Sequence, residues 1–100
     1  MLEKFNTIIS DKKPVLIDFY AEWCGPCKML SPHLKTAKEQ IQDAGKIVKI
    51  NVDKYPDIAA EFGVRGVPTL IFFKEGVSLW RQSGFISAPE IVKLFHTYGK

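Results

Sequence analysis

A short apolar run over residues 15–20 leads directly into a pair of cysteines and a long helical pattern, and this succession constrains the fold most. The run is apolar on both faces, which is typical of a central strand. Apolar residues recur at helical spacing over residues 26–44, where Gly45 is expected to cap the helix in a left-handed conformation. Residues 47–53 alternate between apolar and polar, which predicts a second strand. Strand, helix and strand at this spacing predict a parallel pair joined by a right-handed crossover.

Three further helices are predicted from local patterns. Apolar residues at helical spacing predict a first helix over residues 2–9. A short helix is predicted over residues 57–62, stopped by Gly63. Ser87 is followed three positions later by Glu90, a capping-box pattern that predicts the start of a final helix.

The segment between the last two helices predicts a hairpin. Residues 69–74 and 77–83 read as strands, and the link Glu75-Gly76 between them is short enough to require antiparallel pairing. With the other elements this gives the order α-β-α-β-α-β-β-α. The sequence therefore predicts an α/β fold in a single domain over residues 1–100, with a mixed sheet of about four strands and helices on both faces.

Composition and charge exclude several classes of function. The 14 basic and 11 acidic residues are spread along the chain and give a net charge of only +3, whereas a nucleic-acid binder would gather its basic residues on one face. No apolar run approaches the ~20 residues that a membrane-spanning helix needs. Residues 1–10 also lack the apolar stretch of a secretory signal, so we expect a cytoplasmic protein with no membrane or nucleic-acid partner.

The chain has two cysteines, Cys24 and Cys27, in a C-x-x-C pattern at the start of the long helix. A structural disulfide closing so short a loop would restrict the unfolded chain little, which leaves catalysis and metal binding to compare. Helix amides favour a thiolate at Cys24, and Cys27 is one turn away, near enough for a disulfide. A zinc site would need a second pair of ligands, but His33 and His96 are far apart and read as surface helix residues, so no metal is expected.

The two residues between the cysteines indicate whether the pair reduces or oxidises its substrates. Gly25 keeps the approach to Cys24 open, and Pro26 makes the link rigid. A histidine in place of Pro26 would further stabilise the thiolate, so its absence indicates a reductant, with an oxidase or isomerase as the alternative.

Residues 19–28, Phe-Tyr-Ala-Glu-Trp-Cys-Gly-Pro-Cys-Lys, resemble the active-site segment of the thioredoxin family. The resemblance continues through residues 49–53, residues 64–69 and Gly84, so it covers nearly the whole chain and implies the thioredoxin fold. Two departures stand out. Too few residues precede the first helix for the extra strand that many members carry there, and Tyr20 stands where many members have tryptophan.

The resemblance implies roles for Asp18 and Lys49. Asp18 resembles the family's buried acid, whose pKa is raised by desolvation and which takes a proton from Cys27. Lys49 resembles the lysine that partners this acid. From the residues alone, Asp18 could instead be a hydrogen-bonded structural residue or face water, and Lys49 could be a solvated strand residue.

A substrate surface is also implied by the resemblance. Val67 and Pro68 resemble the family's cis-proline loop, which lies against the redox pair and binds an extended substrate through the backbone of Val67; sequence alone favours a trans bond. Trp23 packs in the core, contacts partners through a partly exposed face, or does both. Trp80 matches no family motif and reads as packing or an exposed edge aromatic. The expected surface around Cys24 comprises Trp23, Gly25, Pro26, Val67, Pro68 and Gly84.

Together these features predict a general disulfide reductase that cycles between a dithiol and a Cys24–Cys27 disulfide through a mixed disulfide with a substrate protein. The family resemblance implies a monomer with no bound cofactor, which receives electrons from NADPH through a flavoprotein, thioredoxin reductase. The alternative is an interaction module on the same fold; the presence of both cysteines, Asp18 and Lys49 argues against it.

Overall fold

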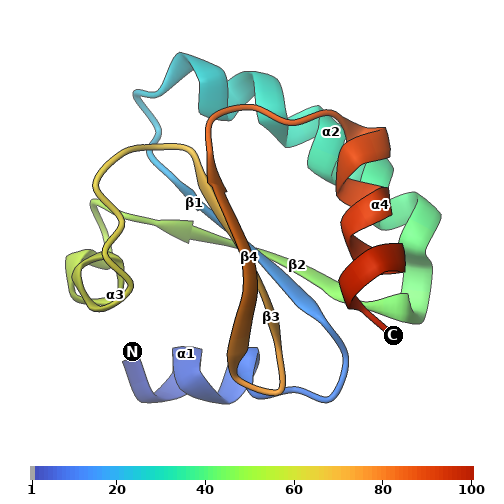
Figure 1. The fold of residues 1–100 in the computed structure, drawn as a ribbon. Helices are drawn as coiled ribbons and strands as arrows, with labels where there is room; N and C mark the ends of the chain where they lie inside the picture. The colour runs from blue at the N-terminus through green and yellow to red at the C-terminus, as the bar shows by residue number, and fades with distance from the viewer. Residues whose placement is uncertain (1) are drawn as a thin grey trace.

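The structure is a computed structural model and describes residues 2–100 (Figure 1). Its elements follow the predicted order. They are α1 (Leu2–Ile9), β1 (Val15–Tyr20), α2 (Gly25–Ile41), the 3-10 turn η1 (Gln42–Ala44), β2 (Lys46–Asn51), α3 (Pro56–Glu61), β3 (Thr69–Lys74), β4 (Val77–Ser83) and α4 (Ala88–Tyr98).

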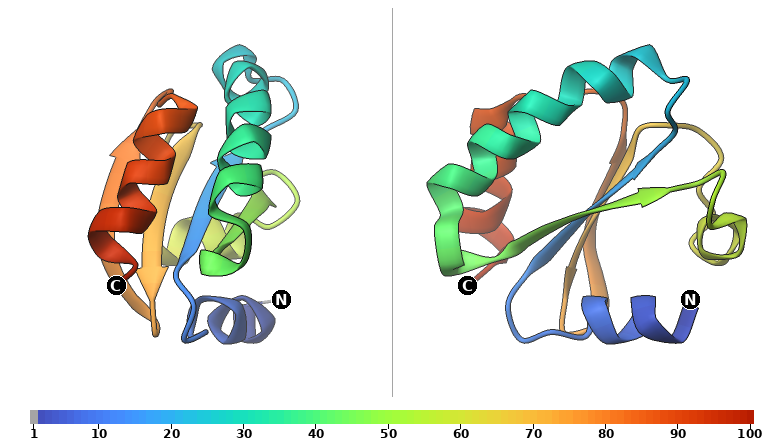
Figure 2. Two further views of the ribbon diagram at one scale, coloured as in Figure 1. Left: turned by 90° about the vertical axis from the view of Figure 1, so that its right-hand side faces the viewer. Right: turned by 180° about the vertical axis from the view of Figure 1, so that it is seen from behind.

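The four strands form one mixed sheet in the order β2-β1-β3-β4. β1 is central, parallel to β2 and antiparallel to β3, so the predicted crossover and hairpin are both confirmed. Helices α2 and α4 cover one face of the sheet, and α1 and α3 lie on the other (Figures 1 and 2). Among the described residues no strand precedes α1, so β2 forms an edge of the sheet.

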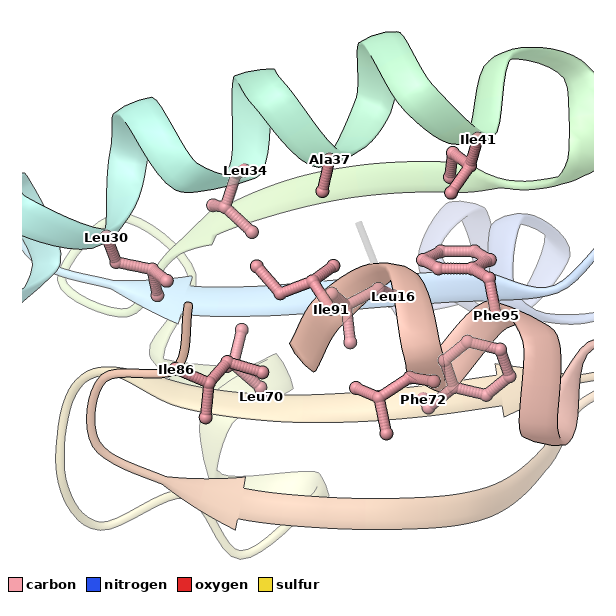
Figure 3. Packing of buried hydrophobic residues seen from close by; sticks show 11 residues of the cluster. Leu16, Leu30, Leu34, Ala37, Ile41, Leu70, Phe72, Ile86, Ile91 and Phe95 are labelled. Carbon is pink, nitrogen blue, oxygen red and sulfur yellow. The ribbon is translucent and has the colours of Figure 1, made fainter. Parts of the chain in front are cut away.

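The core is divided by the sheet into two apolar clusters. Leu16 of β1 faces α2 and α4, where it packs with the apolar faces of both helices (Figure 3). Val15, Ile17 and Phe19 point the other way, toward α1 and α3. Because successive side chains of a strand alternate between its faces, Asp18 lies on the same face as Leu16, beneath α2.

Local sequence signals account for most of the turns. Glu75 and Gly76 have φ values of 52° and 83°, the left-handed pair that a two-residue hairpin needs. Gly63 ends α3 with a φ of 63°. The Ser87 hydroxyl accepts a hydrogen bond from the amide of Glu90 at 3.4 Å and thereby caps α4. Each of these predictions is confirmed.

The prediction of a left-handed cap at Gly45 is wrong. α2 ends at Ile41, and the residue with positive φ is Gln42, at 50°, whereas Gly45 is extended with a φ of −176°. A side chain at Gly45 would collide with the ring of Phe95 and with the carbonyl oxygen of Pro14. Gly45 therefore meets a packing requirement imposed by α4, and no unusual backbone conformation is involved.

No helix of the described chain has the length and apolar character needed to cross a membrane.

Candidate active site

Cys24 and Cys27 form a disulfide at the first turn of α2. Cys24 is the N-cap, with extended φ and ψ of −86° and 113°, and its sulfur accepts a hydrogen bond from the amide of Cys27 at 3.1 Å. The Cα atoms are 5.3 Å apart, within the range of a disulfide. Pro26 lies in the first turn, where the helix does not use its missing amide hydrogen. Both cysteines are 4% exposed.

The segments singled out by the family resemblance lie beside this pair. The Val67–Pro68 peptide bond is cis, as the resemblance implied. The sulfur of Cys24 is 3.7 Å from the carbonyl oxygen of Val67. The amide of Gly84 donates to the carbonyl oxygen of Pro68 at 2.9 Å, which ties the end of β4 to the same loop. The loop of Val67 and Pro68 thus lies beside Cys24, and Gly84 is joined to that loop.

Asp18 is fully buried, and neither of its carboxylate oxygens has a hydrogen-bond partner among the described residues. Burial raises the pKa of Asp18 from 3.8 to about 6, because the charged form loses its hydration; the positive charge of Lys49 acts in the opposite direction. The alternative in which Asp18 faces bulk water is therefore excluded, and within residues 2–100 no protein group hydrogen-bonds its carboxylate.

Lys49 lies beside Asp18 in the register of β1 and β2, but no hydrogen bond or salt bridge joins them. Its ammonium group donates instead to the Ser31 hydroxyl at 3.3 Å and stands 4.6 Å from the ring centre of Tyr20. The ammonium group of Lys49 thus makes a cation–π contact with Tyr20, and the Lys49 side chain is exposed. Lys49 is thus near enough to affect the pKa of Asp18 without neutralising it.

A surface hollow of about 280 Å³ opens over this region. Both Cys27 and Lys49 line this hollow. Its lining residues are Tyr20, Ala21, Glu22, Cys27, Lys28, Ser31 and Lys49.

Trp23 is on the surface, and the core-packing alternative for it is wrong. The indole is 71% exposed, and its N–H donates to the carboxylate of Asp53 at 2.8 Å. Asp53 is in turn placed by a tight turn in which its amide donates to the Asn51 side chain at 2.9 Å. Sequence reasoning gave Asp53 no role of its own, because nothing in the local pattern shows that it meets a residue 30 positions away.

His33 is also not the plain surface residue that was expected. Its Nδ1 accepts a hydrogen bond from the amide of Ala88 at 3.0 Å, and its ring packs edge-on against Phe85 at 4.9 Å. His33, which lies on α2, therefore holds the start of α4 against α2. Trp80 is half-buried and packs against the cluster between the sheet and these two helices, although it lies on an edge strand.

The described residues contain no group of three or more His, Cys, Asp or Glu side chains that could hold a metal ion. A cysteine pair at the start of a helix, with the backbone of a neighbouring loop beside its first sulfur, is the geometry of a thiol–disulfide exchange site. The fold and site therefore define a thiol–disulfide oxidoreductase.

Comparison with known proteins agrees with this class. The thioredoxin family model matches residues 1–97. The chain is 42% identical over 95 residues to a thioredoxin of Mycoplasma genitalium, covering 95% of this chain and 92% of that protein. It is 51% identical over 91 residues to a thioredoxin of Pyropia yezoensis, covering 91% and 85%. A mutant thioredoxin structure from Halobacterium salinarum superimposes with a TM-score of 0.88 at 38% identity, covering 98% and 85%.

The chain belongs to the thioredoxin family. It is a protein thiol–disulfide oxidoreductase with protein-disulfide reductase activity, carried by a redox-active cysteine pair. Members of this family act on disulfide substrates and work without a bound cofactor.

Proposed function

We propose that the protein is a general disulfide reductase in which Cys24 is the nucleophile and Cys27 the resolving thiol. The Cys24 thiolate attacks a substrate disulfide, forming a mixed disulfide and releasing one substrate thiolate. Cys27 then attacks the Cys24 sulfur, which forms the Cys24–Cys27 disulfide and releases the second substrate thiolate. Two electrons pass to the substrate, and the protein ends in the disulfide form. The position of Cys24 at the helix N-cap supports its role as the thiolate.

In this mechanism Asp18 accepts the proton of Cys27 before the second attack. The support is its burial, its lack of a hydrogen-bond partner and its pKa of about 6, which leaves it ionised at neutral pH and still basic enough to take a proton. Lys49 moderates that pKa through its charge. We assign to both residues the roles that the family resemblance implies.

The substrate surface in this proposal consists of Trp23, Gly25, Pro26, Val67, Pro68 and Gly84. The approach of Val67 to Cys24 supports it, because a backbone segment beside the nucleophile can pair with an extended substrate. The exposed indole of Trp23 supports a contact with partners.

The remaining parts of the proposal concern the cellular setting. We propose a cytoplasmic monomer formed by one domain over residues 1–100, which is returned to the dithiol form by a flavoprotein thioredoxin reductase that draws electrons from NADPH. A reductase needs such a supply because its disulfide form is inactive toward further substrate. Reduction of the disulfide by NADPH plus a purified reductase, followed by absorbance at 340 nm, tests this part separately.

The assay that tests the core of the proposal is insulin-disulfide reduction with dithiothreitol, comparing the wild type with Cys24→Ser and Cys27→Ser. Both variants are expected to lose turnover. In a second incubation, with pre-reduced protein and no free dithiothreitol, only Cys27→Ser retains the nucleophile, so only it should accumulate a mixed disulfide with the substrate, seen by non-reducing electrophoresis. Trapping by Cys24→Ser instead would reverse the assigned roles. A titration against glutathione that gave an oxidising couple would favour the oxidase alternative.

A further inference from the structure

The open edge of β2 has backbone groups that no described residue uses. The amides of Lys46 and Val52 point toward β1 and donate there, each at 2.9 Å. Because backbone groups alternate between the two sides of a strand, those of Ile47 and Lys49 point away from β1. Within residues 2–100 no neighbouring strand pairs with them. The edge can therefore accept one more strand.

A hollow of about 220 Å³ lies between this edge and α2. Leu34 and Ile47 give it apolar surface, while three lysines and a hydroxyl supply its polar groups. No carboxylate lines it. The full lining is Ser31, Leu34, Lys35, Lys38, Ile47 and Lys49.

The lysines of this hollow are not neutralised by acids. The one salt bridge among the described residues joins Lys46 to Asp11, outside the hollow. The ammonium group of Lys38 donates to two backbone carbonyl oxygens at 2.6 and 3.0 Å, and that of Lys49 donates to Ser31. All of these acceptors are uncharged. A carboxylate that enters the hollow therefore meets lysines that have no salt-bridge partner among the described residues.

The hollow is continuous with the active site. It shares Ser31 and Lys49 with the larger hollow that Cys27 lines. A substrate segment that lies along β2 would therefore extend toward Cys27.

We propose that β2 docks an extended, acidic segment of a substrate protein as a fifth strand. The backbone of the segment pairs with Ile47 and Lys49. Because side chains of a strand alternate, every second residue faces α2, and acids at those positions meet Lys35 and Lys38. The residues between them lie on the side of Val48, which packs in the opposite cluster, and are best apolar. This inference rests on the proposed reductase function, for which it names a class of substrate.

The test is a titration of the ¹⁵N-labelled disulfide form with two capped hexapeptides of identical composition. One alternates glutamate and valine, and the other has three glutamates followed by three valines. The alternating peptide should shift the amide signals of Ile47 and Lys49. It should also bind about fivefold more tightly, because only its glutamates all lie on the face of Lys35 and Lys38, and one or two surface ion pairs account for such a factor.

Variants separate the backbone from the charge contribution. Ile47→Pro removes an amide that faces away from β1, a place where an edge strand tolerates proline, and should weaken binding about fivefold. Lys35→Gln should weaken it about threefold, whereas Lys93→Gln on α4 should change nothing. The dispersion of the ¹⁵N spectrum shows whether each variant folds. If Ile47→Pro does not fold, the comparison of Lys35→Gln with Lys93→Gln still tests whether the peptide binds beside β2.

Three results would overturn the proposal: equal affinity for both peptides, signal shifts confined to residues away from β2, or self-association of the protein through β2 in place of peptide binding. No thiol exchange takes place in the titration, because the protein is already in the disulfide form. A failure here is therefore distinct from a failure of insulin reduction by the wild type.

Discussion

β1 and β2 bring two aspartate–lysine neighbours together, and the two behave in opposite ways. Before the start of β1, Asp11 accepts a hydrogen bond from Lys46 at 2.6 Å, and this contact lowers the pKa of Asp11. Further along the same strands, Asp18 lies beside Lys49 in register but forms no hydrogen bond or salt bridge with it, and burial raises the pKa of Asp18.

The difference shows that adjacency in a sheet does not make an ion pair. Asp11 and Lys46 meet at the surface, where water and the hydrogen bond both favour the charged carboxylate. Asp18 is shielded from solvent and has no hydrogen-bond partner among the described residues, a state that destabilises the fold. A protein retains such a group where it needs a proton acceptor, and the position of Asp18 beneath the helix of the redox pair fits that use.

The largest effect is expected for Asp18→Asn. The pKa of Asp18 rises from 3.8 to about 6 on folding, so the wild type loses stability as pH rises from about 4 to 6 and stays less stable above that. Removing the charge should raise the free energy of unfolding by about 2–3 kcal/mol at pH 8 and by almost nothing at pH 4. Urea unfolding of the disulfide forms at both pH values measures this. An equal gain at the two pH values would mean that the charge of Asp18 is not its source.

The same variant should slow insulin reduction and flatten its pH dependence near pH 6, because the proposed proton acceptor is gone. An unchanged profile would remove Asp18 from the mechanism while leaving its effect on stability intact.

A smaller effect is expected for Lys49→Met. This variant should widen the difference between the pKa of Asp18 and that of Asp11. Since the charge of Lys49 lowers the pKa of Asp18, its loss should raise that pKa further. Carbon-13 NMR titration of the carboxyl group measures it. Lys46→Met, which removes a lysine from the other end of β2, is the matched control and should leave Asp18 unaffected.

The smallest effect is expected for Asp11→Asn. Because the pKa of Asp11 is lowered on folding, its contribution is present at neutral pH and disappears as pH falls below 4. The variant should show a slightly lower urea midpoint at pH 7, with the difference reduced further in 1 M salt. A large loss of stability that persists in 1 M salt would mean that Asp11 and Lys46 stabilise the fold more than exposed ion pairs usually do.

The parts of the fold that the sequence predicted well depend on residues close together in the chain. The Glu75-Gly76 hairpin, the stop at Gly63 and the Ser87 cap each need only a few neighbouring residues. The cysteine pair is equally local, and the burial of Asp18 could be expected from its place in an apolar strand and from the family resemblance.

The features that could not be predicted depend on partners far away in the sequence. Gly45 was assigned to a cap because its neighbours form a helix end, whereas the residue that requires it is Phe95. His33 meets Ala88 across 55 positions, and Trp23 meets Asp53 across 30. Periodicity shows which face of an element is apolar but not which residue it meets, so these contacts carry no signal in a single sequence.

The two apolar clusters have a consequence for the time at which the chain can fold during its synthesis. The cluster under α1 and α3 is complete once Phe73 has been made, since its members lie between Phe5 and Phe73. The cluster under α2 needs Ile86, Ile91 and Phe95, which come last. Until then α2 alone covers that face of the sheet, so a chain truncated after β3 leaves part of this cluster open to chaperones and proteases.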